Sequence, residues 1–174
     1  MTDLMLDLET WGKPPNGVIT EIGWAVFDAE EIRETGVIYV DPQSCENAGL
    51  RADVSTMKWC LDNPRTDCPG FWPDLDEALH KLSRIVSRTG PTRVWAKSPA
   101  FDLAILETAY RLVFGGEYGA ARPWEFRQER DVRTLLEAAN VEASKAVHSA
   151  EADARAQAGD VQRAWAKLKG AANV

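Results

Sequence analysis

The chain has 174 residues, of which 45% are hydrophobic, so it is long enough for one domain with a buried core. Its formal charge of −7 argues against strong non-specific binding of a polyanion through a basic surface, although a polyanion held locally through bound cations is compatible with it. No apolar run is long enough to span a bilayer, and the N-terminus lacks the basic start and cleavage site of a signal peptide. We therefore expect a cytoplasmic protein without membrane contact, one domain over residues 1–174, and free thiols at the three cysteines.

Apolar and β-branched runs predict three consecutive strands in the first part of the chain: residues 3–9, 18–28 and 35–40. The connections between these strands are short, which favours an antiparallel meander. Residues 41–73 contain four prolines and are expected to be irregular, apart from a short helix over residues 55–61 for which Ser55 is the candidate N-cap.

Helical periodicity dominates the rest of the chain, with helices predicted at residues 74–88, 99–113, 131–139 and 150–168. A short strand is predicted at residues 93–96, and residues 117–130 are expected to form a loop. Ser98 and Pro99 have the residue types of an N-cap and a first helical position. His80 is expected on the surface of its helix. This order of elements predicts an α/β fold, in which helices pack on a mixed sheet.

Two acids, Asp7 and Glu9, stand two positions apart at the end of the first predicted strand, in the stretch LMLDLET. Side chains at this spacing project from the same side of a strand. Two neighbouring carboxylates repel each other, so they are either solvated at the strand end or neutralised by a bound cation. The D-x-E pattern alone is common and leaves both interpretations open.

Three further residues bear on that choice. Asp102 is predicted in the first turn of a helix that follows an apolar strand, where the helix dipole favours an acid and where the ends of neighbouring strands are close. His148 and Asp153 are five positions apart, which does not place them on one helical face. His148 can nevertheless reach Asp153 if it lies on the loop that enters the last helix.

Four acids and a histidine together have a simple chemical interpretation. Mg²⁺ and Mn²⁺ prefer oxygen ligands, and two such ions about 3.5–4 Å apart can hold the attacking and leaving oxygens of a phosphodiester displacement. A histidine with a pKa near neutrality can accept the proton of the attacking water. The residues therefore predict metal-dependent hydrolysis of a phosphodiester.

With these motifs in order, the sequence resembles the DEDD (DnaQ-like) 3′-5′ exonuclease superfamily, in its histidine-containing DEDDh branch. LMLDLET matches the first motif, SPAFD the second, and HSAEADA the third, whose pattern is H-x-A-x-x-D-A. The stretch RDVRTLLEAA is similar to a further region of the small phage and bacterial exonucleases related to exonuclease VIII. The resemblance covers nearly the whole chain.

The resemblance implies a ribonuclease-H-like fold, with a mixed five-stranded sheet whose first three strands are antiparallel. It implies 3′-to-5′ hydrolysis at single-stranded or 3′-overhanging ends, which releases nucleoside 5′-monophosphates. Asp7, Glu9, Asp102 and Asp153 would bind two Mg²⁺ or Mn²⁺ ions, and His148 would be the general base. We expect DNA slightly more than RNA as substrate, a homodimer by analogy with small relatives, and the bacterial host cytoplasm if a phage encodes the chain.

Substrate contacts are expected just after the first motif and beside the second. Thr10 and Trp11 occupy positions at which relatives hold the terminal nucleotide; Trp11 either stacks on a base or sugar or covers the core. Phe101 is either a wedge against the substrate or a core residue. The chain has AKSP where relatives often have an asparagine before the second-motif acid. Lys97 in that stretch is either solvated or close to a phosphate.

Two other classes of function compete with the exonuclease. The stretch DLET has the D-x-x-T pattern of a phosphatase with an aspartyl nucleophile. That mechanism requires a second aspartate where this chain has Glu9, and it gives His148 no role. A non-catalytic module that binds nucleic acid or protein on the same fold predicts the loss of at least one metal ligand. All five expected positions are filled, which favours the enzyme.

Overall fold

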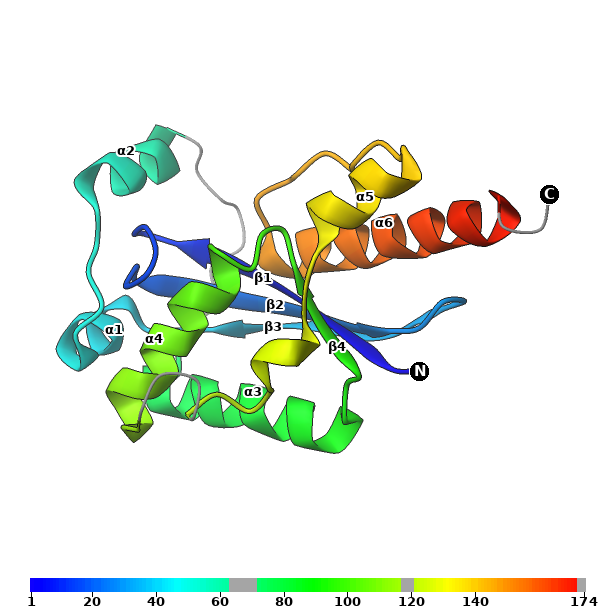
Figure 1. Ribbon diagram of the computed structural model, residues 1–174. Coiled ribbons are helices and arrows are strands. Elements are labelled where there is room, and N and C mark those ends of the chain that lie inside the picture. Colours follow the sequence, from blue (N-terminus) through cyan, green and yellow to red (C-terminus); the bar gives the residue numbers. More distant parts are fainter. Residues whose placement is uncertain (63–71, 117–120, 172–174) are drawn as a thin grey trace.

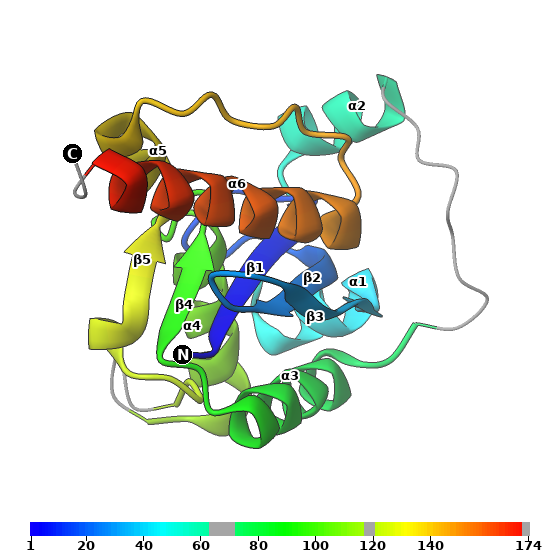
Figure 2. The ribbon, with the colours of Figure 1, turned by 90° about the vertical axis from the view of Figure 1, so that its right-hand side faces the viewer.

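The structure is a computed structural model that describes residues 1–62, 72–116 and 121–171. Its centre is a mixed five-stranded sheet with the order β3-β2-β1-β4-β5 (Figures 1 and 2). The strands are β1 (Asp3–Thr10), β2 (Ile19–Phe27), β3 (Ile32–Tyr39), β4 (Arg93–Ala96) and β5 (Glu129–Asp131). β1, β2 and β3 form the antiparallel meander, whereas β4 runs parallel to β1 and β5 runs parallel to β4. This confirms the mixed sheet that was predicted.

Helices cover both faces of this sheet (Figure 1). The helical elements are α1 (Pro42–Ala48), α2 (Val54–Asp62), α3 (Leu75–Thr89), α4 (Asp102–Phe114), the 3₁₀ turn η1 (Phe126–Gln128), α5 (Val132–Ala139) and α6 (Ala150–Ala171). α1, α3 and α4 lie on one face, and α5 and α6 lie on the other. Within the three described segments, no helix has the length and apolar character needed to cross a membrane.

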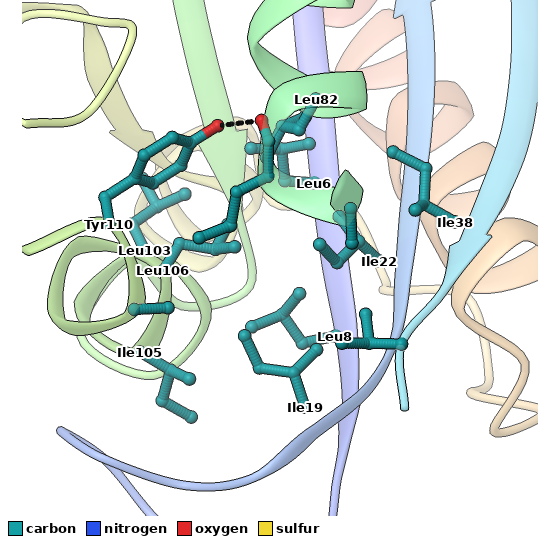
Figure 3. Packing of buried hydrophobic residues seen from close by; sticks show 14 of the residues in the cluster. Leu6, Leu8, Ile19, Ile22, Ile38, Leu82, Leu103, Ile105, Leu106 and Tyr110 are labelled. Atoms are coloured by element: carbon teal, nitrogen blue, oxygen red, sulfur yellow. Dashed lines mark hydrogen bonds between the residues drawn. The ribbon is translucent and has the colours of Figure 1, made fainter. Parts of the chain in front are cut away.

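Alternation along β1 determines which face each of its side chains uses. Leu4, Leu6 and Leu8 belong to the cluster under α3 and α4, and Met5 belongs to the cluster under α5 and α6. Figure 3 shows the first cluster, in which the Tyr110 hydroxyl donates to the carbonyl of Leu79 at 2.9 Å. A one-residue slip of β1 would move these leucines to the face under α5 and α6 and turn Asp7 and Glu9 into the apolar cluster under α3 and α4, where an unpaired charge is costly. The apolar pattern therefore sets the register, and with it the direction of the acids further along the strand.

Most predicted elements are confirmed within a few residues, with four corrections. The prediction of an irregular chain after residue 41 missed α1, because Pro42 was interpreted as a breaker although it stands in the first turn of a helix, where proline is favourable. The Asp41 side chain caps that helix by accepting from the amide of Ser44 at 2.9 Å. Ser55 is not the cap of α2: Asp53 accepts from the amide of Thr56 at 2.9 Å.

The other corrections concern the edge of the sheet and the start of α4. The predicted loop over residues 117–130 contains β5, which has only three residues and no apolar alternation, so its pairing with β4 defines it. α4 begins at Asp102 rather than at Pro99, and the Ser98 carbonyl, not its side chain, accepts from the Asp102 amide at 3.1 Å. Cys45 and Cys60 are free thiols, as predicted, whereas Cys68 and the remainder of residues 63–71 lie outside the described residues.

Candidate active site

The carboxyl ends of the parallel strands meet at one edge of the sheet, and the predicted site lies there. β1 supplies two acids, α4 begins shortly after β4, and α6 packs across β1 and β2. These elements carry all five predicted catalytic residues: Asp7 and Glu9 on β1, Asp102 as the first residue of α4, His148 just before α6, and Asp153 in its first turn. The fold therefore brings together acids from both ends of the chain.

Glu9, His148 and Asp153 form the most compact part of the site. One ligand atom from each of these three side chains lies within 4.8 Å of the other two. The Asp153 carboxylate accepts from the amides of Val147 and His148, each at 2.9 Å, so it fixes the loop that carries the histidine. His148 is exposed and has a φ of 58°, in the left-handed region that is unfavourable for a side chain bearing a Cβ. The two hydrogen bonds from the backbone amides to Asp153 hold His148 in that conformation.

Asp7 and Asp102 form the second part of the site. The Leu8 amide donates to Asp102 Oδ1 at 3.0 Å, which ties the start of α4 to β1. Burial, and then the neighbouring charge of Asp102, raise the pKa of Asp7 to about 8; the charges of Glu9 and Asp153 act in the same direction. Burial likewise raises the pKa of Asp102 to about 7, opposed by the Leu8 amide. Burial disfavours the charged form of both carboxyls, and the neighbouring acids add to this effect at Asp7.

An all-carboxylate donor set with this surplus of negative charge suits hard divalent cations. The residues present fit the expected metal ions, and bound cations would replace the protons that the acids otherwise hold.

Gln157 is a site residue that the sequence analysis missed. Its Nε2 donates to Asp7 Oδ1 at 2.7 Å, its side chain is buried, and its Oε1 has no hydrogen-bond partner within the described residues. It stands one turn after Asp153 on α6, so the i, i+4 spacing from a predicted ligand is the signal that could have found it. Gln157 fixes the orientation of Asp7.

β2 positions the start of α6. The Ala150 amide donates to Glu21 Oε2 at 3.3 Å. A Cβ on Gly23 would lie 1.9 Å from the Ala150 carbonyl oxygen, so only glycine allows this approach. The placement of Asp153 against β1 therefore depends on a glycine in the neighbouring strand.

The predicted substrate-contact residues are near the site but largely engaged in the fold. Thr10 is buried, and its hydroxyl donates to the Gly12 carbonyl at 2.9 Å. Trp11 and Phe101 are half-buried and pack against the core beneath α3 and α4. Trp59, which the sequence analysis did not single out, is 44% exposed, and its ring lies edge-on to His148 with 4.8 Å between centroids. The described structure therefore places Trp59 against a catalytic candidate.

Comparison with solved structures finds nucleases. The nuclease domain of 3'hExo, a DEDDh family member solved with rAMP, has a TM-score of 0.62 and 14% identity, over 95% of this chain and 92% of that chain. A full-length 3'-exonuclease has a TM-score of 0.53 and 13% identity, over 95% and 81%. A 3'-exonuclease solved in 3'-end specific recognition of histone mRNA stem-loop has a TM-score of 0.50 and 11% identity, over 97% and 81%. No curated protein matches the chain. These similarities show the fold.

The sheet topology and the acidic cluster with its histidine define the class, which is a DEDDh 3′-5′ exonuclease with a ribonuclease-H-like fold. The chain belongs to the family described as the 3'-5' exoribonuclease Rv2179c-like domain, whose model matches residues 2–165. The expected superfamily and the enzyme class are thereby confirmed, and the non-catalytic alternative is set aside. The closer relation to exonuclease VIII stays a prediction.

Proposed function

We propose that this chain removes nucleotides from the 3′ end of single-stranded or 3′-overhanging RNA, with release of nucleoside 5′-monophosphates. The sequence alone slightly favoured DNA. The family description names an exoribonuclease, and two structural neighbours were solved with rAMP or with an mRNA stem-loop, which supports RNA as the first substrate to test. The observation that carries the proposal is the group formed by Glu9, His148 and Asp153 beside the Asp7–Asp102 pair.

The four carboxylates have the role of binding two Mg²⁺ or Mn²⁺ ions. When bound, these cations would stabilise the negative charge that develops on the phosphate during displacement. Asp102 is held by the Leu8 amide and Asp7 by Gln157, so both carboxylates are oriented before any ligand arrives. Asp153 is oriented by the two loop amides that it accepts.

His148 is proposed as the general base. It is exposed beside Glu9 and Asp153, where a water that attacks the terminal phosphodiester would be within its reach. The edge-on contact with Trp59 limits the rotation of its ring. The exposed face of Trp59 also offers a surface on which the terminal base can stack. The expected homodimer and the cytoplasmic location stay predictions.

The proposal is tested with 5′-labelled RNA and DNA oligonucleotides of one sequence, incubated with Mg²⁺ or Mn²⁺ and in parallel with a chelator. We expect a metal-dependent ladder that shortens from the 3′ end, with RNA degraded faster than DNA. Asp102→Asn should abolish the ladder, whereas Asp76→Asn, at an exposed acid of α3, should retain it. A folded protein that yields no ladder on either polymer would refute the proposal, and faster degradation of DNA would refute the RNA preference.

A further inference from the structure

Two basic side chains lie at the same sheet edge as the acidic site. Lys97 directly follows β4, and Arg133 is the second residue of α5, which directly follows β5. Because β4 and β5 run parallel to β1, the residues that follow these strands lie side by side at the carboxyl edge of the sheet. Arg133 Nη2 lies 3.4 Å from the Lys97 carbonyl oxygen, so the two residues are neighbours.

The positive charge of the Arg133 guanidinium acts electrostatically on Asp102, the acid at the start of α4. Arg133 therefore belongs to the rim of the site rather than to a distant surface.

Both cations are available to a ligand. Arg133 is exposed and Lys97 is half-buried, and neither forms an ion pair within residues 1–62, 72–116 and 121–171. Asp131 is the acid nearest to Arg133 in the sequence, but its carboxylate caps α5 by accepting from the Arg133 amide at 2.8 Å. By contrast, Arg93 and Arg122 are paired with the buried acids Asp3 and Glu107.

The basic character continues along β5, the outer strand of the sheet in Figure 2. Arg130 is exposed and donates to the carbonyls of Arg127 and Glu129, at 2.6 and 2.7 Å. Arg127 lies over the ring of Phe126, 5.3 Å from its centroid, and that ring is 65% exposed. Exposed arginines next to an open aromatic ring are a combination that single-stranded nucleic acids bind.

We propose that Lys97 and Arg133 form a phosphate-binding subsite for the strand behind the 3′-terminal nucleotide, and that this strand continues over Arg130 along β5. The inference rests on the proposed function, because it assigns the path of the polynucleotide that the acidic centre would cut. A chain with a formal charge of −7 repels a polyanion overall, so local cations must hold the strand at its entry. Contacts of this kind position the backbone and do not read its sequence.

The test compares KM and kcat for a 5′-labelled single-stranded RNA of about ten nucleotides, over a range of salt concentrations. Arg133→Gln and Lys97→Gln should each raise KM roughly five- to tenfold, with a smaller change in kcat, because each removes an exposed charge-assisted contact. Each should also make the slope of log KM against log salt shallower by about 0.7, the value for one phosphate contact on a single strand. Arg133→Lys should restore the slope.

The matched control is Arg84→Gln, which removes the same charge from an exposed position on α3, in the opposite helical layer. The subsite is overturned if Arg133→Gln and this control have the same KM and salt slope, or if Arg133→Gln lowers kcat alone. In both cases, RNA hydrolysis by the unaltered protein still supports the proposed function. If the unaltered protein does not hydrolyse RNA, the Kd of the same oligonucleotide by fluorescence anisotropy takes the place of KM. Equal salt slopes of Kd for the two variants would then overturn the subsite.

Discussion

The metal-free protein should become more stable when Asp7 is replaced by asparagine, although the same change should abolish hydrolysis. The pKa of Asp7 is raised from 3.8 to about 8, first by burial and then by the charge of Asp102. The unfolded chain releases the Asp7 proton near pH 4, whereas the folded protein keeps it up to about pH 8, because its pKa is higher in the folded state. The free energy of unfolding should therefore fall as the pH rises from about 4 to about 8. Asparagine has no carboxyl to ionise, so Asp7→Asn should remove this contribution to the pH dependence.

The size of the effect follows from the two pKa values. A difference between 3.8 and about 8 corresponds to at most about 6 kcal/mol, since each tenfold change in proton affinity is worth about 1.4 kcal/mol. Asp7 is only half-buried and competes with Asp102 for protons, so we reduce the expected gain at pH 8 to about 2 kcal/mol. For a chain of this length, that is a rise in Tm of about 4–8 °C. The asparagine can still accept the Gln157 hydrogen bond.

The assay is thermal unfolding in chelator between pH 5 and pH 8.5, followed by circular dichroism. The unaltered protein should lose stability as the pH rises, and Asp7→Asn should lose less and exceed it at pH 8. The control Asp76→Asn, at an exposed acid, should follow the unaltered protein within about 0.5 kcal/mol. The reasoning is refuted if the Tm of the unaltered protein is constant over this range, or if Asp7→Asn is the less stable protein at pH 8.

Four further outcomes are expected. Mn²⁺ at about 100 times its Kd should stabilise the unaltered protein by about 2.7 kcal/mol, and an unchanged Tm would count against a built metal site. His148→Ala should lower kcat at least about 100-fold, whereas His80→Ala, at the exposed histidine of α3, should leave it unchanged. If both variants lost the same factor in kcat, His148 would not be the general base. Gln157→Leu should raise the Mn²⁺ concentration for half-maximal activity by about 10- to 100-fold, because Asp7 loses the group that orients it. A Mn²⁺ titration that superimposes on that of the unaltered protein would show that Gln157 does not have this role. Gly23→Ala should lower the Tm and weaken Mn²⁺ binding together, because α6 must move away from β2; an unchanged protein would mean that this close approach is not required.

The parts of the site that could be predicted are those encoded locally. Two acids at alternate positions of a strand, and a histidine five residues before an acid at a helix start, can be recognised within one short stretch each. Alternation of Leu4, Met5 and Leu6 between the two core clusters then determines the direction of the acids. These features place the ligands on their elements before any tertiary contact is known.

The features that could not be predicted depend on contacts between distant segments. Gln157 acquires its role only because α6 lies against β1, and Trp59 only because α2 approaches the loop of His148. β5 has no apolar pattern of its own and exists through its pairing with β4. α1 is different, because its signals were local: Asp41 and Pro42 are a capping acid and a first-turn proline, which were interpreted as features of an irregular segment.

The central claim is that side chains from β1, α4, α6 and the loop before α6 form one hydrolytic centre for two cations. The most direct measurement is the anomalous scattering of manganese in crystals grown with Mn²⁺ and a nucleoside 5′-monophosphate. We predict two peaks about 4 Å apart among Asp7, Glu9, Asp102 and Asp153, with the phosphate in contact with both. Manganese bound elsewhere, or a single peak in the presence of the nucleotide, would contradict the account.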